Sequence, residues 1–343
     1  MMRIFIVEYV AGGGLAGQPL PPTLFVEAAA MLCAAVADFA ALDGHHLITT
    51  RDPRLEADLL AGQVHTVRPG GFSDTVEACL AACDAALVIA PEPGGVLAGL
   101  VERVEGARVL NLGSSSDAVR VTADKLATIE RLAAAGLPVP PTVEAAVPAA
   151  AAALGFPLVL KPRDGAGCIG LRRVEEASGL EEAWRLATAE SGGAPLIAQP
   201  YLPGQHASVS LLCDGRDALA ISLNSQAIAE GERFEYRGGV VPLDHPLRER
   251  ALELAVRACR AVPGLRGYIG VDLVLGPDAT ILEINPRLTT AYTGLRRAIG
   301  GNLAALLLRA ARGELPGSVP LVARARFTAG GEVDVEPLKG AAA

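Results

Sequence analysis

The first third of the chain alternates short apolar runs with a longer segment of helical periodicity. Apolar residues recur at helical spacing from Phe25 to Ala41. Short apolar runs occupy residues 4–7, 47–50, 86–90 and 109–112. Strands that alternate with helices in this way are typical of a small parallel sheet covered by helices. We therefore predict an α/β domain over residues 1–116.

Two further units follow along the chain. Residues 114–117 form a helix start, and we expect one helix from there to Gly136. A Gly-Gly-Ala-Pro sequence marks the end of this second unit, residues 117–194. From residue 195 the pattern changes to a series of strands with two long helices, which predicts an α+β unit over residues 195–330. Residues 331–343 are expected to form a tail. The fold class that we expect is α/β followed by α+β.

Residues 268–287 predict an antiparallel hairpin. Two apolar runs flank a Gly-Pro-Asp sequence, which is typical of a tight turn. If the turn is centred between the proline and the aspartate, Leu275 faces Thr280. Counting outward from that pair places Asp272 directly opposite Glu283.

Two carboxylates side by side between apolar neighbours predict a bound cation, because they would repel each other and be costly to keep charged. Strand alternation puts Asn285 on the face of Glu283, and Mg²⁺ prefers oxygen ligands from Asp, Glu and Asn. Arg287, further along that face, would reach negative charge on a transferred phosphoryl group or an acyl intermediate. We therefore interpret Asp272, Glu283 and Asn285 as ligands of an ATP-metal site. A hairpin with one solvated polar face is the alternative interpretation.

Lysine is rare in this chain. Only three of the 30 Lys and Arg residues are lysines, namely Lys125, Lys161 and Lys339. Because arginine cannot always replace a compact, flexible ammonium, a lysine kept in an arginine-rich chain is a candidate functional residue. Lys339 lies in the expected tail and is set aside. Lys161 ends an apolar run and precedes the glycine-rich residues 162–170, whose backbone N–H groups can approach phosphate oxygens and which can close as a lid.

Residues 196–209 predict an apolar strand, a Pro-Gly kink and a second strand. Such a segment can pair an adenine edge with backbone groups, while a polar residue past the kink meets the ribose. His206 stands at that place, and a plain surface histidine is the alternative interpretation.

Composition limits the partners and the cellular compartment that we expect for this protein. The net charge of −8 and the aromatic content of 4% argue against nucleic acid. We expect no stretch long and charge-free enough to cross a bilayer, and the early apolar run after Arg3 leaves no room for a signal peptide. The six cysteines form no Cys-x-x-Cys pair, so we expect reduced thiols and a cytoplasmic location.

The order of these motifs resembles the ATP-grasp superfamily over nearly the whole chain. A lysine, a second lysine with a glycine-rich loop, a hinge strand, an Asp and a Glu-x-Asn motif follow one another. The resemblance implies an N-terminal pre-ATP-grasp domain followed by two ATP-gripping subdomains. It also implies ATP and Mg²⁺ as cofactors, with Mn²⁺ as an alternative metal. The substrates would be a small-molecule acid and a small-molecule amine, and we expect neither a membrane nor a nucleic-acid partner. The resemblance leaves open whether the protein forms a homodimer.

The resemblance also implies individual roles. Lys161 and Arg287 would be catalytic, and Lys125 would join Lys161 at the ATP phosphates. The remaining ATP contacts would be Gly165, Gly167 and Gly170 in the lid, Gln199, Tyr201 and Leu202 at adenine, and His206 at the ribose. The family often has Glu at the positions of Gln199 and His206.

A narrower resemblance concerns the substrate. Three segments, Glu8 to Gly14, Ala90 to Glu92 and Tyr236 to Gly239, resemble the tyramine-glutamate ligases of methanofuran biosynthesis. This implies that ATP phosphorylates the γ-carboxylate of glutamate and that tyramine, or a related amine such as tyrosine, attacks the acyl-phosphate. Glu8, Glu92 and Arg237 would contact substrate, unless each is a capping or salt-bridge residue. A dipeptide or amino-acid ligase, a carboxylase, a phosphotransferase and a non-catalytic nucleotide-binding regulator are the alternatives.

Overall fold

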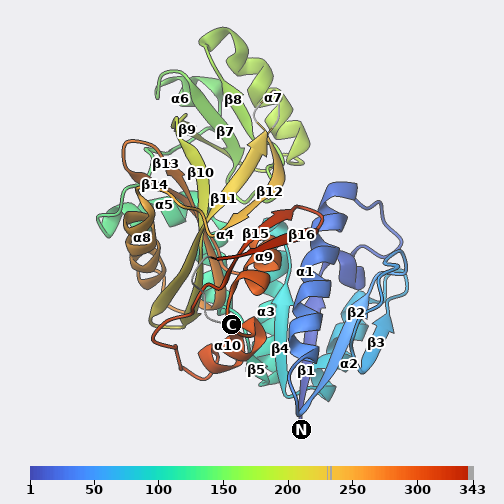
Figure 1. Cartoon of the computed structure of the whole chain (residues 1–343). Helices are drawn as coiled ribbons and strands as arrows, with labels where there is room; N and C mark the ends of the chain where they lie inside the picture. Colours follow the sequence, from blue (N-terminus) through green and yellow to red (C-terminus); the bar gives the residue numbers. More distant parts are fainter. Residues whose placement is uncertain (230, 232–233, 339–343) are drawn as a thin grey trace.

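The computed structural model describes residues 1–229, 231 and 234–338. Its strands form three sheets (Figure 1): five strands in the N-terminal part of the chain, four in the middle and seven toward the C-terminal end. Lys339, which the sequence analysis set aside, lies outside the described residues. The three sheets correspond to the three expected units, with differences at two boundaries.

The N-terminal sheet is parallel throughout, with the order β3-β2-β1-β4-β5. Its elements are β1 (Met2–Glu8), η1 (Val10–Gly14), α1 (Pro22–Ala40), β2 (His45–Arg51), β3 (Gln63–Thr66), α2 (Phe72–Ala82), β4 (Ala85–Ile89), η2 (Pro93–Gly95), α3 (Val96–Ala107) and β5 (Leu110–Asn111). Alternate residues of β1 face opposite sides: Ile4 and Ile6 pack with α1, whereas Phe5 and Val7 pack with α2 and α3. The predicted α/β domain is confirmed.

The helix expected after residue 114 is two helices, α4 (Ser116–Ala123) and α5 (Lys125–Ala134). Ser115 caps α4 as expected, but Asp124 leaves the helical conformation and interrupts the run. Its carboxylate accepts hydrogen bonds from the backbone N–H groups of Leu126 and Ala127, which makes it the N-cap of α5. The break places Lys125 at the first position of α5.

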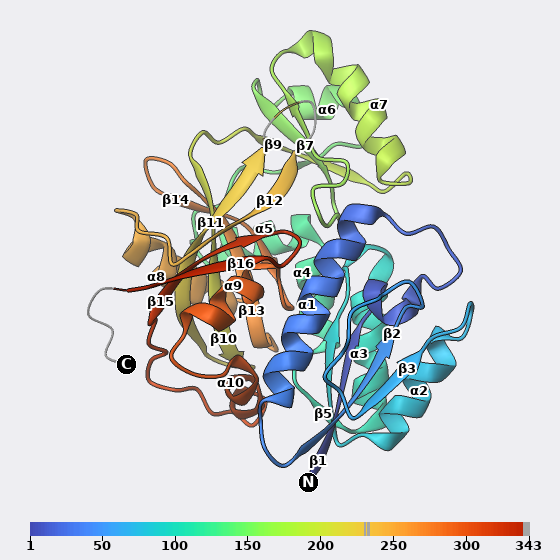
Figure 2. The ribbon, with the colours of Figure 1, turned by 45° about the vertical axis from the view of Figure 1, so that its right-hand side comes forward.

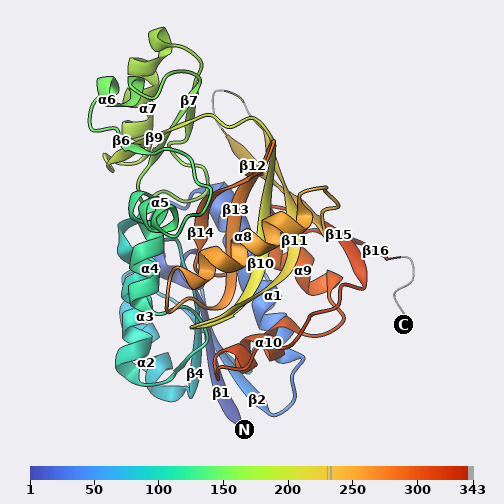
Figure 3. The ribbon, with the colours of Figure 1, turned by 90° about the vertical axis from the view of Figure 1, so that its left-hand side faces the viewer.

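The middle sheet is small and antiparallel, with the order β6-β9-β7-β8. Its elements are β6 (Val143–Glu144), α6 (Pro148–Ala152), β7 (Leu158–Pro162), β8 (Arg172–Val174), η3 (Ala177–Gly179), α7 (Leu180–Glu190) and β9 (Leu196–Pro200). Because β9 pairs with β7, the boundary expected at residue 194 is one strand too early. Figure 3 shows this sheet with α6 and α7 at one end of the molecule, away from the parallel sheet.

The large sheet is antiparallel, with the order β14-β13-β10-β11-β12-β15-β16. Its elements are β10 (Gln205–Asp214), β11 (Ala218–Ala229), β12 (Glu235–Val241), α8 (Arg248–Arg260), β13 (Arg266–Leu275), β14 (Ala279–Asn285), α9 (Ala291–Ala298), α10 (Leu303–Ala310), β15 (Ala323–Thr328) and β16 (Val333–Pro337). The strand β16 occupies part of the expected tail. The helix α8 covers one face of the sheet, and α9 and α10 cover the other.

The helix α1 joins the N-terminal and large sheets. Among the described residues it is the one helix long and apolar enough to cross a membrane by length and composition, so the expectation that no segment qualifies is wrong. In the structure α1 packs against β1 and β2 on one side and against α9 and α10 on the other (Figure 2). Its buried Asp38 accepts a hydrogen bond from Tyr292 at 2.7 Å and pairs with Arg296 at 2.6 Å. These contacts make α1 a core helix.

Candidate active site

A cavity lies between α1 of the N-terminal unit, the four-stranded sheet and the large sheet. Its walls come from α1, the start of α5, β7 and the glycine-rich segment, the link between β9 and β10, the large sheet, and the segment after β14. The predicted site residues that line it are Lys125, Lys161, Gly165, Gly167, Gln199, Tyr201, Leu202, His206, Asp272, Glu283, Asn285 and Arg287. The fold thus brings together residues that are far apart in the sequence.

The strands β13 and β14 form the predicted hairpin, but their register differs from the prediction. Leu275 pairs with Ala279 and not with Thr280. An irregularity next to Asp272 then shifts the register by one residue, so Asp272 still pairs with Glu283. A β-bulge of this kind re-aims side chains. The predicted carboxylate pair is confirmed, although the turn alone would have misaligned it.

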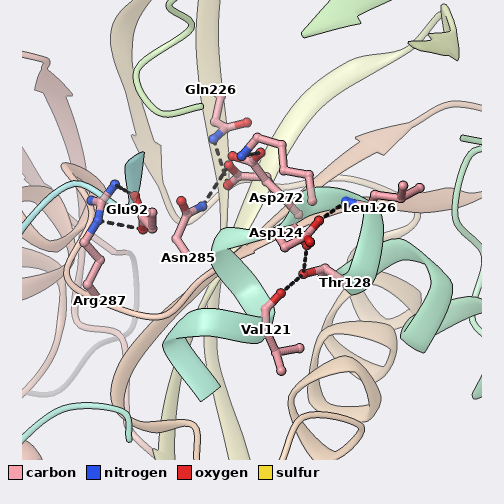
Figure 4. A network of polar contacts seen from close by, with 11 residues as sticks. Glu92, Val121, Asp124, Leu126, Thr128, Gln226, Asp272, Asn285 and Arg287 are labelled. Atoms are coloured by element: carbon pink, nitrogen blue, oxygen red, sulfur yellow. Dashed lines mark hydrogen bonds and ion pairs between the residues drawn. The ribbon is translucent and has the colours of Figure 1, made fainter. Parts of the chain in front are cut away.

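Three further side chains, from α5, β11 and β14, contact this carboxylate pair; Figure 4 shows the two that bond to Asp272. The Nζ atom of Lys125 lies 2.8 Å from Oε2 of Glu283. Nδ2 of Asn285 donates to Oδ2 of Asp272 at 3.0 Å, and Nε2 of Gln226, on β11, donates to Oδ1 of Asp272 at 3.0 Å. Both oxygens of Asp272 therefore accept hydrogen bonds from amide side chains.

The charges of the cavity side chains perturb one another's pKa values. Burial and the adjacent Glu283 carboxylate raise the pKa of Asp272 well above its ordinary value. Burial acts on Glu283 as well, but the ammonium groups of Lys125 and Lys161 outweigh it and keep the pKa of Glu283 low. Burial lowers the pKa of Lys161 from 10.5 to about 8, although Glu283 opposes this shift. Perturbed groups gathered in one cavity are typical of a functional site.

The oxygen groups around Asp272 fit a small, hard cation. Two carboxylates and a carboxamide, from Asp272, Glu283 and Asn285, form a donor set that Mg²⁺ favours. The raised pKa of Asp272 indicates that the pair lacks positive charge even with Lys125 in place. No group of three or more His, Cys, Asp or Glu side chains placed to hold a metal occurs in the described part of the chain. Phosphate and water oxygens would therefore complete the metal's coordination.

Arg287 follows β14 and reaches the N-terminal unit. Its Nε and Nη2 donate to Oε1 and Oε2 of Glu92, each at 2.9 Å, and the two side chains are 14% and 7% exposed (Figure 4). A two-point pair of this kind fixes the plane of the guanidinium. Glu92 follows β4 next to β1, where the strand order of the parallel sheet reverses, and ligands bind in the crevice at such a point. Glu92 therefore sets the direction of the Arg287 charge at the cavity wall.

The three residues expected to contact substrate do not line the cavity. Glu8 is 2% exposed and accepts a hydrogen bond from a backbone N–H of its own loop at 2.5 Å, so it caps η1. Arg237 is exposed and pairs with Glu235 at 3.0 Å. Glu8 and Arg237 thus have partners close by in the chain, and substrate contact by either stays a prediction. Glu92 is the partner of Arg287.

The glycine-rich segment between β7 and β8 forms one wall of the cavity. Gly165 and Gly167 line the cavity, whereas Gly170, expected there as well, does not. Gly170 has a φ of 71°, and a Cβ there would lie 2.9 Å from a neighbouring proline ring, so its backbone requires glycine. Asp164 accepts a hydrogen bond at 3.3 Å from the backbone N–H of Gly94, which connects the segment to the N-terminal unit.

The link between β9 and β10 forms a further wall. The predicted adenosine contacts on it are Gln199, Tyr201, Leu202 and His206. Gln199 is buried, and its Nε2 donates to Oγ1 of Thr142 at 2.8 Å. The guanidinium of Arg173 lies 3.7 Å from the centroid of the Tyr201 ring. The four predicted adenosine contacts therefore share one wall of the cavity, and their role at adenosine stays a prediction.

Several cavity residues were not among the predicted site residues. Gln226 and Tyr236 reach the cavity because β11 and β12 follow β10 in the large sheet. The Tyr236 hydroxyl accepts a hydrogen bond from Thr290 at 2.9 Å. Glu27 reaches it from α1. Glu27 and Gln226 stand alone in their segments, so only the tertiary fold identifies them. Tyr236 begins one of the segments that carry the narrower family resemblance.

Comparison with known proteins identifies the family. A model of the ATP-grasp domain matches residues 122–291, and a model of the pre ATP-grasp 3 domain matches residues 45–119. The chain is 31% identical over 231 residues to a tyramine–L-glutamate ligase from Methanocaldococcus fervens, and the match covers 67% of each chain. The chain belongs to the ATP-grasp family. It is accordingly an ATP-dependent carboxylate-amine ligase.

Other ATP-grasp proteins extend the comparison. The chain is 33% identical over 193 residues to a D-alanine–D-alanine ligase from Gloeobacter violaceus, covering 50% of this chain and 61% of that one. The solved structure of an ATP-grasp superfamily protein from Archaeoglobus fulgidus superposes with a TM-score of 0.72 and 27% identity, covering 99% of this chain and 100% of that one. The ATP-grasp fold thus extends over the whole chain.

Proposed function

We propose that this ATP-grasp ligase joins the γ-carboxylate of glutamate to a primary amine such as tyramine, in methanofuran-type cofactor biosynthesis. The observation that supports this best is the 31% identity to a tyramine–L-glutamate ligase over two thirds of both chains. The cavity adds the chemistry, because it gathers lysines, paired carboxylates, a carboxamide and a buried arginine.

The reaction has two steps. A γ-carboxylate oxygen of glutamate takes the γ-phosphoryl group of ATP, and ADP leaves. The amine nitrogen then attacks the acyl carbon, phosphate leaves with the former carboxylate oxygen, and the nitrogen loses a proton to complete the amide. Phosphate is a much better leaving group than hydroxide, which is why the carboxylate is phosphorylated first.

The lysines and the hairpin would bind the charged part of ATP. Lys125 starts α5 and Lys161 ends β7, and both line the cavity beside Glu283. Two ammonium groups there would contact phosphate oxygens. Mg²⁺, or Mn²⁺ in its place, would neutralise phosphate charge and would be held by Asp272, Glu283 and Asn285.

Arg287 would stabilise the acyl-phosphate. Its guanidinium lines the cavity and is held at two points by Glu92. A donor fixed in advance stabilises developing negative charge without having to reorganise during the reaction. Glu92 would act through Arg287 and is therefore a positioning residue.

We also place the ligase in the cytoplasm, where ATP is available and cysteines stay reduced. All six cysteines are free in the structure. A homodimer, left open by the family resemblance, is not required by this chemistry, because every residue invoked comes from one chain.

The test is steady-state ADP release from Mg-ATP with L-glutamate and a panel of amines, with product masses. We expect ADP only when acid and amine are both present, with one ADP for each γ-glutamyl amide. ADP release with pairs of other amino acids, and not with glutamate, would favour an amino-acid ligase, which the identity to the D-alanine–D-alanine ligase supports. Nucleotide binding without ADP release across the panel would instead indicate a nucleotide-binding regulator.

A further inference from the structure

Glu27 is the acidic residue that α1 contributes to the cavity wall. It lies in the second turn of α1, whose N-terminal end points toward the four-stranded sheet in Figure 2. The side chain is half-buried, and no hydrogen bond or ion pair joins it to any other residue of the described ranges. The groups that interact with it electrostatically are Arg287, Cys168 and Tyr236.

Within the described residues, no group neutralises this carboxylate fully. Burial raises the pKa of Glu27 to about 7, and the nearby Arg287 opposes that shift only in part. Both donating nitrogens of Arg287 that face Glu92 are already engaged at 2.9 Å. A half-buried carboxylate without a partner is stabilised by a cation that comes from outside the chain.

The cavity that Glu27 lines also has apolar and aromatic walls. Cavity residues on α1, β11, β12, the link between them and α9 include Met31, Ile228, Phe234, Tyr236 and Ala291. Aromatic walls of this kind accommodate an aryl or alkyl body. The lysine and arginine residues that line the cavity within the described ranges come from α5, β7 and the segment after β14, and none comes from α1 or β12. This part of the cavity therefore suits a ligand with an apolar body and a positively charged end.

We propose that Glu27 binds the ammonium group of the acceptor and selects amines that have no carboxylate next to the nitrogen. The inference rests on the proposed ligase function and refines its substrate class. Tyramine brings only positive charge to Glu27, whereas tyrosine brings a carboxylate on the carbon that carries its amine. That carboxylate would face Glu27 and would find Arg287 already paired with Glu92. Like charges in an apolar pocket reject the wrong ligand.

The experiment compares tyramine with tyrosine as acceptors for wild type, Glu27→Gln and the matched control Glu56→Gln. Glu56 is exposed and lies outside the cavity, so its variant makes the same charge change without affecting the acceptor. At saturating Mg-ATP and glutamate, we expect wild type to prefer tyramine. Losing a charged hydrogen-bond partner should raise the tyramine KM of Glu27→Gln roughly 10- to 100-fold. The tyrosine kcat/KM should stay level or rise, and Glu27→Asp should fall between the two.

A second assay separates the proposed ligase function from the inference about Glu27. Hydroxylamine is uncharged at neutral pH and traps a glutamyl phosphate as a hydroxamate. If wild type forms neither hydroxamate nor amide, the proposed function fails. If wild type forms both and Glu27→Gln keeps the wild-type preference for tyramine over tyrosine, the inference about Glu27 is wrong while the ligase stands. A raised KM for glutamate with an unchanged KM for tyramine would assign Glu27 to the donor and overturn the inference as well.

Discussion

Replacing Lys161 with methionine should stabilise the ligand-free protein and abolish its use of ATP. Lys161 is 7% exposed, and burial lowers its pKa from 10.5 to about 8. The difference corresponds to about 3 kcal/mol, which is the cost of keeping this ammonium charged at neutral pH. Methionine keeps the length of the side chain without the charge. We expect a gain of about 1–3 kcal/mol, whose upper value is this full cost; the pKa of about 8 already includes the attraction to Glu283.

The gain should depend on pH with a definite sign. A lysine whose pKa is lower in the folded than in the unfolded protein contributes stability above pH 10.5, and that contribution is lost as the pH falls through about 8. The advantage of Lys161→Met over wild type is therefore largest below pH 8 and disappears toward pH 10.5. A pH series of melting midpoints without nucleotide measures it.

Mg-ATP should reverse the order of stability. A ligand that binds only the folded protein stabilises it by about 2.7 kcal/mol at 100 times its Kd. Wild type should gain this and Lys161→Met should not. Lys125→Met provides the contrast: burial lowers the pKa of Lys125, but Glu283 and other carboxylates raise it overall, so this variant should be less stable even without nucleotide. If Lys161→Met melts below wild type at pH 7 without nucleotide, or if Mg-ATP stabilises both equally, the reasoning is refuted.

Three further variants test other parts of the site. Glu92→Gln should loosen Arg287 and lower kcat about 10- to 100-fold, with little change in the KM for ATP. An unchanged kcat in steady-state kinetics would show that Glu92 does not position Arg287. Asp272→Asn should lower Mg-dependent ADP release by at least about 100-fold while the protein stays folded, and normal saturation by Mg²⁺ would exclude Asp272 as a ligand. Gly170→Ala should strain the glycine-rich segment by about 1–3 kcal/mol and raise the KM for ATP. Gly179→Ala is the control, because a Cβ there meets nothing within 4 Å. Equal effects of the two variants on the KM for ATP would contradict a role of the Gly170 backbone in ATP binding.

Local patterns predicted much of the fold. The alternation of apolar runs with a helical segment predicted the parallel sheet, because a buried strand is recognisable from its own few residues. The strand β3 (Gln63–Thr66) is largely exposed and was not predicted. Interruptions inside a pattern were missed. Asp124 divides one expected helix into two because its side chain caps the second, and β9 crosses the expected boundary because its partner β7 lies well before it in the chain.

The candidate site was predictable where its residues share one hairpin or one loop. Asp272 and Glu283 face each other, although a bulge rather than the turn aligns them. Glu27 and Gln226 were not predictable, because α1 and β11 bring single residues to the cavity through long-range packing. Substrate contact by Glu8, which the family resemblance implied, stays a prediction: the structure shows its carboxylate accepting a hydrogen bond from its own loop.

The most direct test of the central claim, amide formation through an acyl-phosphate, follows an oxygen atom. The ligase would be supplied with glutamate carrying ¹⁸O in its γ-carboxylate, Mg-ATP and tyramine, and the phosphate and nucleotide products would be analysed by mass. The account predicts one ¹⁸O atom in each inorganic phosphate released, with ADP as the nucleotide product. Phosphate without ¹⁸O, or ¹⁸O found in AMP, would contradict it.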